Sequence, residues 1–235
     1  MNWYNALHKL LLLILPLFLL SACSDPSEIA QSALAAVHPK RTELEFRALK
    51  QFPPDIVCGE YNAISVMGEE TGYQNFIIRA GKADKRPSDA DNAIYCSRKP
   101  AEALEELFGI VPADDSNTTL MQTMADFDAL AAALAAFETD MFALPKRQPG
   151  LSQLSVSSID VLPPRKFRKG GYIEAIPQDP WGRAYLYDSS QLGGVKGTYE
   201  IKTLGADGIA GGSGQNADIS TTHMGYLKHI INNDS

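Results

Sequence analysis

The strongest constraint on the fold is an apolar stripe in the segment from Thr118 to Leu144. Its large apolar residues recur at spacings of three or four, the repeat of one face of an α-helix: Leu120, Met124, Phe127, Leu130, Leu134, Phe137 and Met141. Pro145 follows and ends the pattern, because proline has no backbone N–H to continue a helix. The spacing predicts one long helix whose stripe must be covered by another layer of structure.

Two segments downstream of this helix have the composition of half-buried antiparallel strands. Residues 185–188 and 199–204 contain aromatic and β-branched residues, and the pair Gly193 and Gly194 lies in their connection. A sheet built from them can cover the apolar stripe. The sequence therefore predicts an α+β fold for residues 118–235, a long helix packed on a small antiparallel sheet.

The N-terminus has the features of an export signal. An apolar run from Leu10 to Leu20 follows a single basic residue, Lys9, and is shorter than the roughly 20 residues that span a bilayer. The run ends in Leu-Ser-Ala-Cys, which matches the bacterial lipobox. We therefore expect a lipoprotein signal peptide over residues 1–22 and a lipid group on Cys23, the alternative being an ordinary signal peptide with a chance cysteine.

Charge and cysteine content narrow the class of protein further. The formal net charge of −7 argues against nucleic acid as a partner, since backbone binding relies on clustered Lys and Arg. Besides Cys23 the chain has only Cys58 and Cys96. An even pair in an exported protein predicts a disulfide, with two free buried thiols as the alternative.

Changes in composition divide the chain. We expect a signal peptide (1–22), a lipidated tether that could include a short helix (23–43), a small disulfide-stapled α+β domain (44–110), a linker (111–117) and a larger domain (118–235). In the domain over 44–110 we expect two or three strands, the last of them at residues 92–96, and a short helix over 101–108. The disulfide is expected to join the first of these strands to the last. Its VCGEYNA and TGYQNF segments resemble a domain of unassigned function in bacterial envelope lipoproteins, which implies an envelope location.

The C-terminal half carries a more specific combination of motifs. PGLSQL, GYIEAIPQDPWGRAYLY and LGADGIAGGSGQNADI follow the helix in that order. From about residue 125 to residue 219 the chain resembles the soluble part of the major pseudopilin of type II secretion systems, general secretion pathway protein G, which polymerises into a short periplasmic fibre. The resemblance implies a pseudopilin-like head with a metal-binding C-terminal loop. In the DPWG turn, we expect Trp181 to pack over the helix stripe.

The glycine-rich segment at residues 204–219 is the predicted metal site, and the resemblance implies Ca²⁺. This ion takes six to eight oxygen ligands, and the segment offers carboxylates from Asp207 and Asp218, an amide oxygen from Asn216 and backbone carbonyls of Leu204 and Ser213. The metal would then order a loop that has no preformed shape. The alternative is a solvated glycine turn in which the two aspartates only cap neighbouring backbone.

The chain also departs from that family. Its members begin with a basic leader, a prepilin peptidase site and about twenty apolar residues that form the fibre core. No such segment stands in front of Thr118, where we expect a lipid site and a disulfide-stapled domain instead. Two functions remain open: a lipid-anchored assembly component linked to a type II secretion or pilus-type system, and a stand-alone envelope binding module. Because Ser24 rather than aspartate follows Cys23, we expect the outer membrane, facing the periplasm.

Catalytic motifs are sparse. The sequence contains no GxSxG, HExxH or phosphate-binding loop, and His223 and His229 are six residues apart, a spacing that fits neither one helix face nor a tight metal turn. A pair of carboxylates that meet only in space stays possible. We expect a protein that is not an enzyme.

Overall fold

The computed structural model describes residues 25–112, 117–155, 167–190 and 197–233. In chain order its elements are α1 (Pro26–Ala35), β1 (Glu43–Phe52), β2 (Ile56–Ile64), β3 (Gln74–Arg79), β4 (Lys82–Asp84), α2 (Asp89–Tyr95), α3 (Pro100–Phe108), α4 (Asn117–Met141), η1 (Gly150–Leu154), β5 (Leu186–Ser190), β6 (Thr198–Thr203), η3 (Gly214–Asn216), β7 (Ile219–Ser220), η4 (Thr221–His223) and α5 (Met224–Asn233). The strands form two antiparallel sheets, β1-β2-β3-β4 and β5-β6-β7. The fold is α+β, as the sequence predicts.

Four of the expectations fall outside the described residues. They are the signal peptide, Cys23, the Gly193–Gly194 pair and most of the expected linker.

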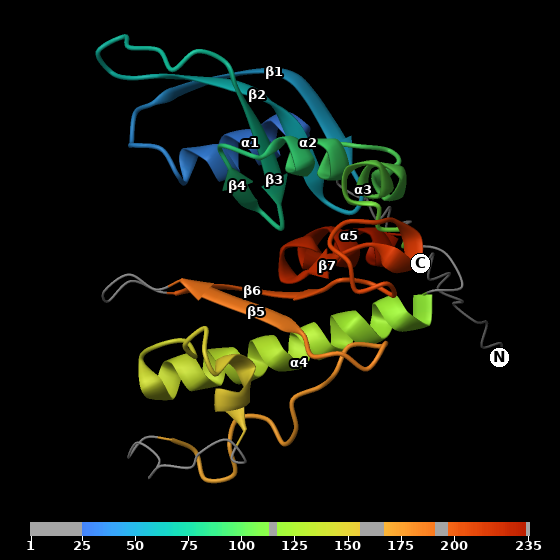
Figure 1. The fold of residues 1–235 in the computed structure, drawn as a ribbon. Helices are drawn as coiled ribbons and strands as arrows, with labels where there is room; N and C mark the ends of the chain where they lie inside the picture. The colour runs from blue at the N-terminus through green and yellow to red at the C-terminus, as the bar shows by residue number, and fades with distance from the viewer. Residues whose placement is uncertain (1–24, 113–116, 156–166, 191–196, 234–235) are drawn as a thin grey trace, which may run out of the picture.

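The four-stranded sheet is covered on both faces, because β2 and β3 alternate their apolar side chains. One face packs on α1 through Val57, Tyr61, Ala63, Phe76 and Ile78. The other face carries Cys58 and Ile77, which pack with Tyr95 at the end of α2. This sheet is therefore the middle layer between α1 and α2 (Figure 1).

Residues 26–35 form a packed helix within the segment expected to be a tether. Asp25 caps α1 by accepting a hydrogen bond from the Ser27 N–H at 2.9 Å. Leu34 is fully buried against the sheet, and Ala30 and Ala33 are buried beside it. The sequence was compatible with a short helix here, but it offered few large apolar residues to pack. The two alanines contribute to the packing because the sheet lies close to them.

The prediction of a last strand at residues 92–96 is wrong. The segment belongs to α2, which begins with a capping box: the Ser88 side chain accepts from the Asp91 N–H, and the Asp91 carboxylate accepts from the Ser88 N–H, each at 3.0 Å. The predicted disulfide between Cys58 and Cys96 is confirmed. It joins β2, the second strand, to the C-terminal cap of α2 and does not join two strands.

Helix α4 confirms the prediction from the apolar stripe. Leu130 and Leu134 are fully buried, and the stripe forms the centre of the largest hydrophobic cluster. The helix ends at Met141, three residues before the predicted end, and Phe142 adopts a positive φ of 57°. By length and composition α4 could cross a membrane. Its stripe packs against β5, β6 and α5 instead, which is the pattern of a core helix.

Tyr185 fixes the position of the three-stranded sheet on α4. Its ring lies 5.3 Å from the Phe127 ring, and its hydroxyl donates to the buried Asp126 carboxylate at 2.7 Å. Burial, and then this carboxylate, raise the pKa of the Tyr185 phenol. Trp181, which was expected to pack on the stripe, is half-buried. The Arg183 guanidinium lies 5.7 Å from the centroid of the Trp181 ring. Tyr185 therefore takes the place that the sequence interpretation gave to Trp181.

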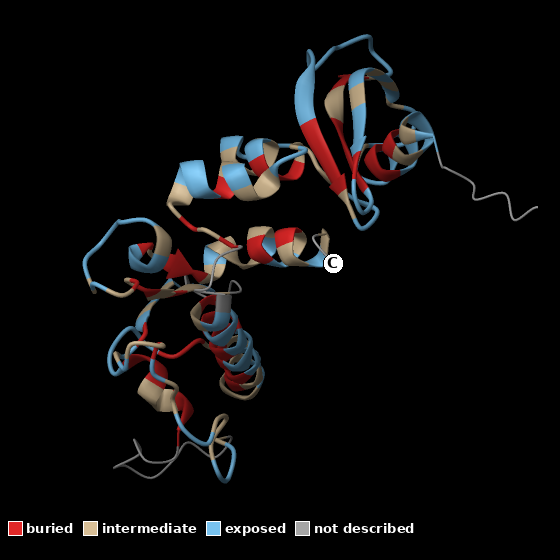
Figure 2. Ribbon diagram, turned by 90° about the vertical axis from the view of Figure 1, so that its right-hand side faces the viewer, coloured by how far each residue is buried: buried red, intermediate tan, exposed pale blue. Residues whose placement is uncertain are grey.

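The C-terminal helix α5, which was not predicted, lies between the two sheets (Figure 1). Buried residues recur along it in Figure 2, and Leu227 and Ile230 belong to the same cluster as the α4 stripe. On its other side the Tyr226 hydroxyl donates to Asp91 at 3.1 Å, and the Tyr226 and Tyr95 rings are 5.2 Å apart. Helix α5 thus contacts both the α4 core and the disulfide-stapled part.

Candidate functional site

The glycine-rich loop, residues 204–218, connects β6 to β7 and is closed at its neck. Thr203 pairs with Ile219, so Leu204 and Asp218 stand one residue beyond the last pair of the sheet. Inside the neck the Ala206 N–H donates to the Gln215 carbonyl at 2.7 Å. Two of the predicted metal ligands, Leu204 and Asp218, are therefore brought together by strand pairing.

Two glycines let this loop fold around the backbone of Asn216. Gly205 has a φ of +62°, and a Cβ added to it would lie 2.6 Å from the Asn216 carbonyl oxygen. Gly212 has a φ of +84°, and its added Cβ would lie 2.5 Å from the same oxygen. Any side chain at either position would collide with backbone, so the loop needs glycine at both.

The predicted carboxylate ligands differ in their surroundings. Asp207 is exposed, and its Oδ1 accepts a hydrogen bond from the Ile209 N–H at 2.9 Å. Asp218 is half-buried, and its Oδ1 is buried without a hydrogen-bond partner among the described residues. A buried carboxylate oxygen with no partner costs free energy unless something else binds it. Ser213, the fifth predicted ligand, is exposed and is the N-terminal cap of η3.

The predicted donors are all oxygen atoms, which suit a hard cation such as Ca²⁺ better than a metal that prefers nitrogen or sulfur ligands. Among the described residues no group of three or more His, Cys, Asp and Glu could hold a metal ion. Calcium does not need such a group, because carbonyl and amide oxygens complete its shell. Nearby, burial lowers the pKa of His223, while Glu200 and Asp218 act to raise it. The orphaned Asp218 oxygen is the feature of this loop that most directly suits a cation.

A turn that the sequence interpretation treated only as structural supports the loop. The Asp179 carboxylate accepts from the Trp181 N–H at 3.1 Å, the Arg183 N–H at 2.8 Å and the Thr203 hydroxyl at 2.7 Å. The Arg183 guanidinium in turn donates to the carbonyls of Gly205 and Ala206 at the start of the loop. The sequence interpretation missed these contacts to Thr203, Gly205 and Ala206, because they reach residues more than twenty positions away.

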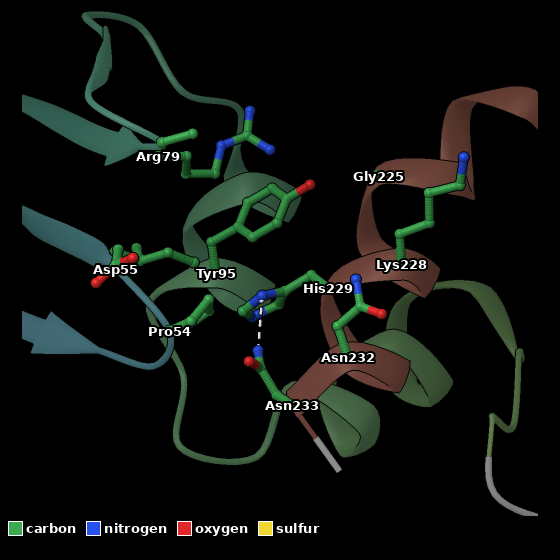
Figure 3. Close-up of a pocket in the computed structure, with 11 residues that line it drawn as sticks. Pro54, Asp55, Arg79, Tyr95, Gly225, Lys228, His229, Asn232 and Asn233 are labelled. Carbon is green, nitrogen blue, oxygen red and sulfur yellow. Dashed lines mark hydrogen bonds between the residues drawn. The ribbon is translucent and has the colours of Figure 1, made fainter. Parts of the chain in front are cut away.

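A second candidate site is a pocket between α5 and the four-stranded sheet (Figure 3). It has a volume of about 280 Å³, and the Tyr95 ring lies in its wall under the Arg79 guanidinium, 4.0 Å from the ring centroid. Lys228 forms an ion pair with Asp128, with 2.7 Å between Nζ and Oδ1. The His229 Nδ1 and the Asn233 Nδ2 form a hydrogen bond of 2.9 Å. Burial, and then Arg79, lower the pKa of His229. Because the basic groups of this pocket have partners within the protein, the glycine-rich loop is the stronger candidate.

Comparison with known proteins places the loop inside a family match. The model of the family "Type II secretion system (T2SS), protein G" matches residues 111–222. Type II secretion system core protein G of Vibrio cholerae is 42% identical over 103 residues, 44% of this chain and 68% of that protein. The Pseudomonas aeruginosa protein of the same name is 42% identical over 94 residues, 40% of this chain and 64% of its own length.

Among solved structures, the major pseudopilin from the type 2 secretion system of enterohaemorrhagic Escherichia coli is similar. The two are 28% identical, with a TM-score of 0.34 and coverage of 45% of this chain and 88% of the other. The matched residues of the curated relatives amount to about two thirds of their lengths. Through its C-terminal region, which holds α4, the three-stranded sheet and the glycine-rich loop, the chain belongs to the type II secretion system protein G family.

Proposed function

We propose that the chain is a calcium-binding, lipid-anchored envelope protein that acts as a structural component linked to a type II secretion system. The relatives are named as core proteins of that system, which supports the secretion role. The single observation that carries the calcium proposal is the buried Asp218 Oδ1 without a hydrogen-bond partner among the described residues. A cation at the loop would remove that unfavourable burial.

In this proposal the metal acts on the shape of the loop. Carboxylates of Asp207 and Asp218, the Asn216 amide and the carbonyls of Leu204 and Ser213 would hold the ion. When bound, calcium supplies oxygen coordination that replaces missing secondary structure, so its binding free energy becomes folding free energy. Residues 204–218 then present one fixed surface beside α5 to a partner.

Calcium is expected to raise the stability of the purified full chain. At a hundred times the dissociation constant, a bound ligand adds about 2.7 kcal/mol to the free energy of unfolding. Urea denaturation in chelator and in excess Ca²⁺ measures this difference. The double variant Asp207→Ala, Asp218→Ala should lose it, while Asp188→Ala, an aspartate exposed on β5, should keep it. Equal stability of the wild type in both buffers would contradict the calcium proposal.

The lipid anchor is proposed from the lipobox that ends in Cys23. A diacylglyceryl group at this position would hold the folded part at a membrane surface, with α1 beginning three residues later at Pro26. The location that follows is the bacterial cell envelope, with the periplasmic face of the outer membrane as the proposed side.

The alternative is a stand-alone envelope binding module. It is favoured by the position of the disulfide-stapled part, which precedes the family match at residues 111–222. Affinity purification of the full chain in mild detergent, from cells that assemble a type II secretion system, separates the two functions. Secretion-system proteins should co-purify with the wild type and be depleted with Cys23→Ser. Their absence from both preparations would favour the stand-alone module.

A further inference from the structure

The end of α3 touches the middle of the glycine-rich loop. Gly109 is the C-terminal cap of α3, with a φ of +69° and its N–H bonded to the Glu105 carbonyl at 2.8 Å. Its own carbonyl accepts a hydrogen bond from the Gly214 N–H at 2.8 Å. One loop amide is therefore held by a residue that precedes the family match, which begins at residue 111.

The approach at this point is between two stretches of backbone. A Cβ added to Gly109 would lie 2.5 Å from the Gly212 carbonyl oxygen and 3.0 Å from the Ser213 Cα. Backbone atoms cannot swing aside as a side chain can, so any substitution at this position must displace either α3 or the loop. Since Gly212 also packs on the Asn216 carbonyl, a displaced loop would lose its fold around that residue.

Helix α3 is itself fixed to the C-terminal region, so it cannot easily give way. The Phe108 ring lies 4.5 Å from the His223 ring and 6.0 Å from the Tyr226 ring, both beyond the loop. Tyr226 also bonds to Asp91 of α2. The loop is thus held at two places, by Arg183 at Gly205 and Ala206 and by the α3 cap at Gly214.

We propose that Gly109 is a positioning residue for the metal loop, and that calcium binding is coupled to the docking of α2 and α3 against the C-terminal region. This inference rests on the proposed calcium site. If docked α3 holds the loop in its binding shape, coupling must be reciprocal: undocking α3 weakens calcium binding, and removing calcium loosens α3. The docking of α2 and α3 in the disulfide-stapled part then depends on whether calcium is bound to the loop.

The test compares two glycines with nearly the same φ. Gly81, in the turn between β3 and β4, has a φ of +70°, but an added Cβ there meets nothing within 4 Å. Gly109→Ala and Gly81→Ala therefore both place alanine at a positive φ, and only the first forces a collision. Calorimetric titration of the full chain with CaCl₂ should show affinity lowered at least roughly fivefold by Gly109→Ala and unchanged by Gly81→Ala.

A second variant and a second readout cover the case in which Gly109→Ala does not fold. Phe108→Ala removes the ring contacts of α3 and leaves the loop backbone untouched, and it too should lower calcium affinity. In the wild type, hydrogen exchange of the α3 amides should slow on adding CaCl₂, while exchange in β2 stays the same.

The outcomes separate the two proposals. Calcium binding by the wild type with equal affinity in both the Gly109 and Phe108 variants would overturn the coupling and leave the calcium site standing. No calcium binding by the wild type would overturn the site and the coupling together.

Discussion

Breaking the disulfide is expected to lower the free energy of unfolding by about 4 kcal/mol, the value that the chain-entropy model gives for a 38-residue separation. The bond closes a segment that holds β3, β4 and α2, so without it the unfolded chain gains conformational freedom. Cys58 is also buried beside Tyr95, which carries the contact with α5. Urea denaturation of the wild type with and without dithiothreitol measures the effect.

The double variant Cys58→Ala, Cys96→Ala is the control for this experiment. It should be destabilised to a similar extent in oxidising buffer, with a small addition for lost sulfur packing, and dithiothreitol should not change it further. If the reduced wild type unfolds within about 1 kcal/mol of the oxidised protein, chain entropy is not what the bond contributes.

Regular patterns of residues in the sequence allowed several elements of this fold to be predicted. The α4 stripe was visible because seven apolar residues repeat at the helical spacing, and that signal depends on no distant contact. The disulfide followed from counting cysteines in an exported chain. Strand β6 was found to within a residue because its alternation is local.

The elements that were missed depend on tertiary contacts. Helix α2 is short and starts from a capping box inside a charged segment that reads as a loop. Helix α5 contains Gly225, a residue that usually weakens a helix. The structure gives the reason: a Cβ there would lie 2.8 Å from the Tyr95 hydroxyl, so glycine permits α5 to approach α2.

The candidate site shows the same division. Carboxylates among glycines at residues 204–219 pointed to an oxygen-rich loop, and strand pairing places Leu204 and Asp218 together at its neck. The burial of Asp218 Oδ1 could not be predicted from the sequence, because it depends on tertiary packing. The contacts from Asp179, Arg183 and Gly109 come from distant parts of the chain, and local sequence does not encode them.

Asp179→Ala is expected to lower the free energy of unfolding by about 3 kcal/mol or more, although the site is outside the predicted metal ligands. The side chain is 2% exposed and accepts from two backbone N–H groups and the buried Thr203 hydroxyl. Alanine would leave the buried Thr203 hydroxyl and two part-buried N–H groups without their acceptor, and it would remove the ion pair of Arg183. Because Arg183 then loses its fixed position under Gly205, calcium affinity should fall as well.

Acid titration tests the same side chain by another route. Burial alone would raise the pKa of Asp179, but hydrogen bonds from the Arg183 and Trp181 N–H groups and from Thr203, together with the Arg183 charge, hold that pKa below its ordinary value. A carboxyl whose folded pKa lies below its unfolded value of about 3.9 stabilises the fold above that value. The contribution is lost as pH falls through the folded pKa.

Asp179→Asn separates the charge from the shape of the side chain. Its loss of stability relative to the wild type, measured by urea denaturation, should be large at pH 7 and shrink as the pH falls below about 4. Asp188→Ala removes an exposed aspartate paired with Arg147 and should change stability little at either pH, since both partners are solvated. A deficit in Asp179→Asn that stays constant from pH 7 into acid would mean that hydrogen-bond geometry, and not the carboxylate charge, holds this turn under the loop.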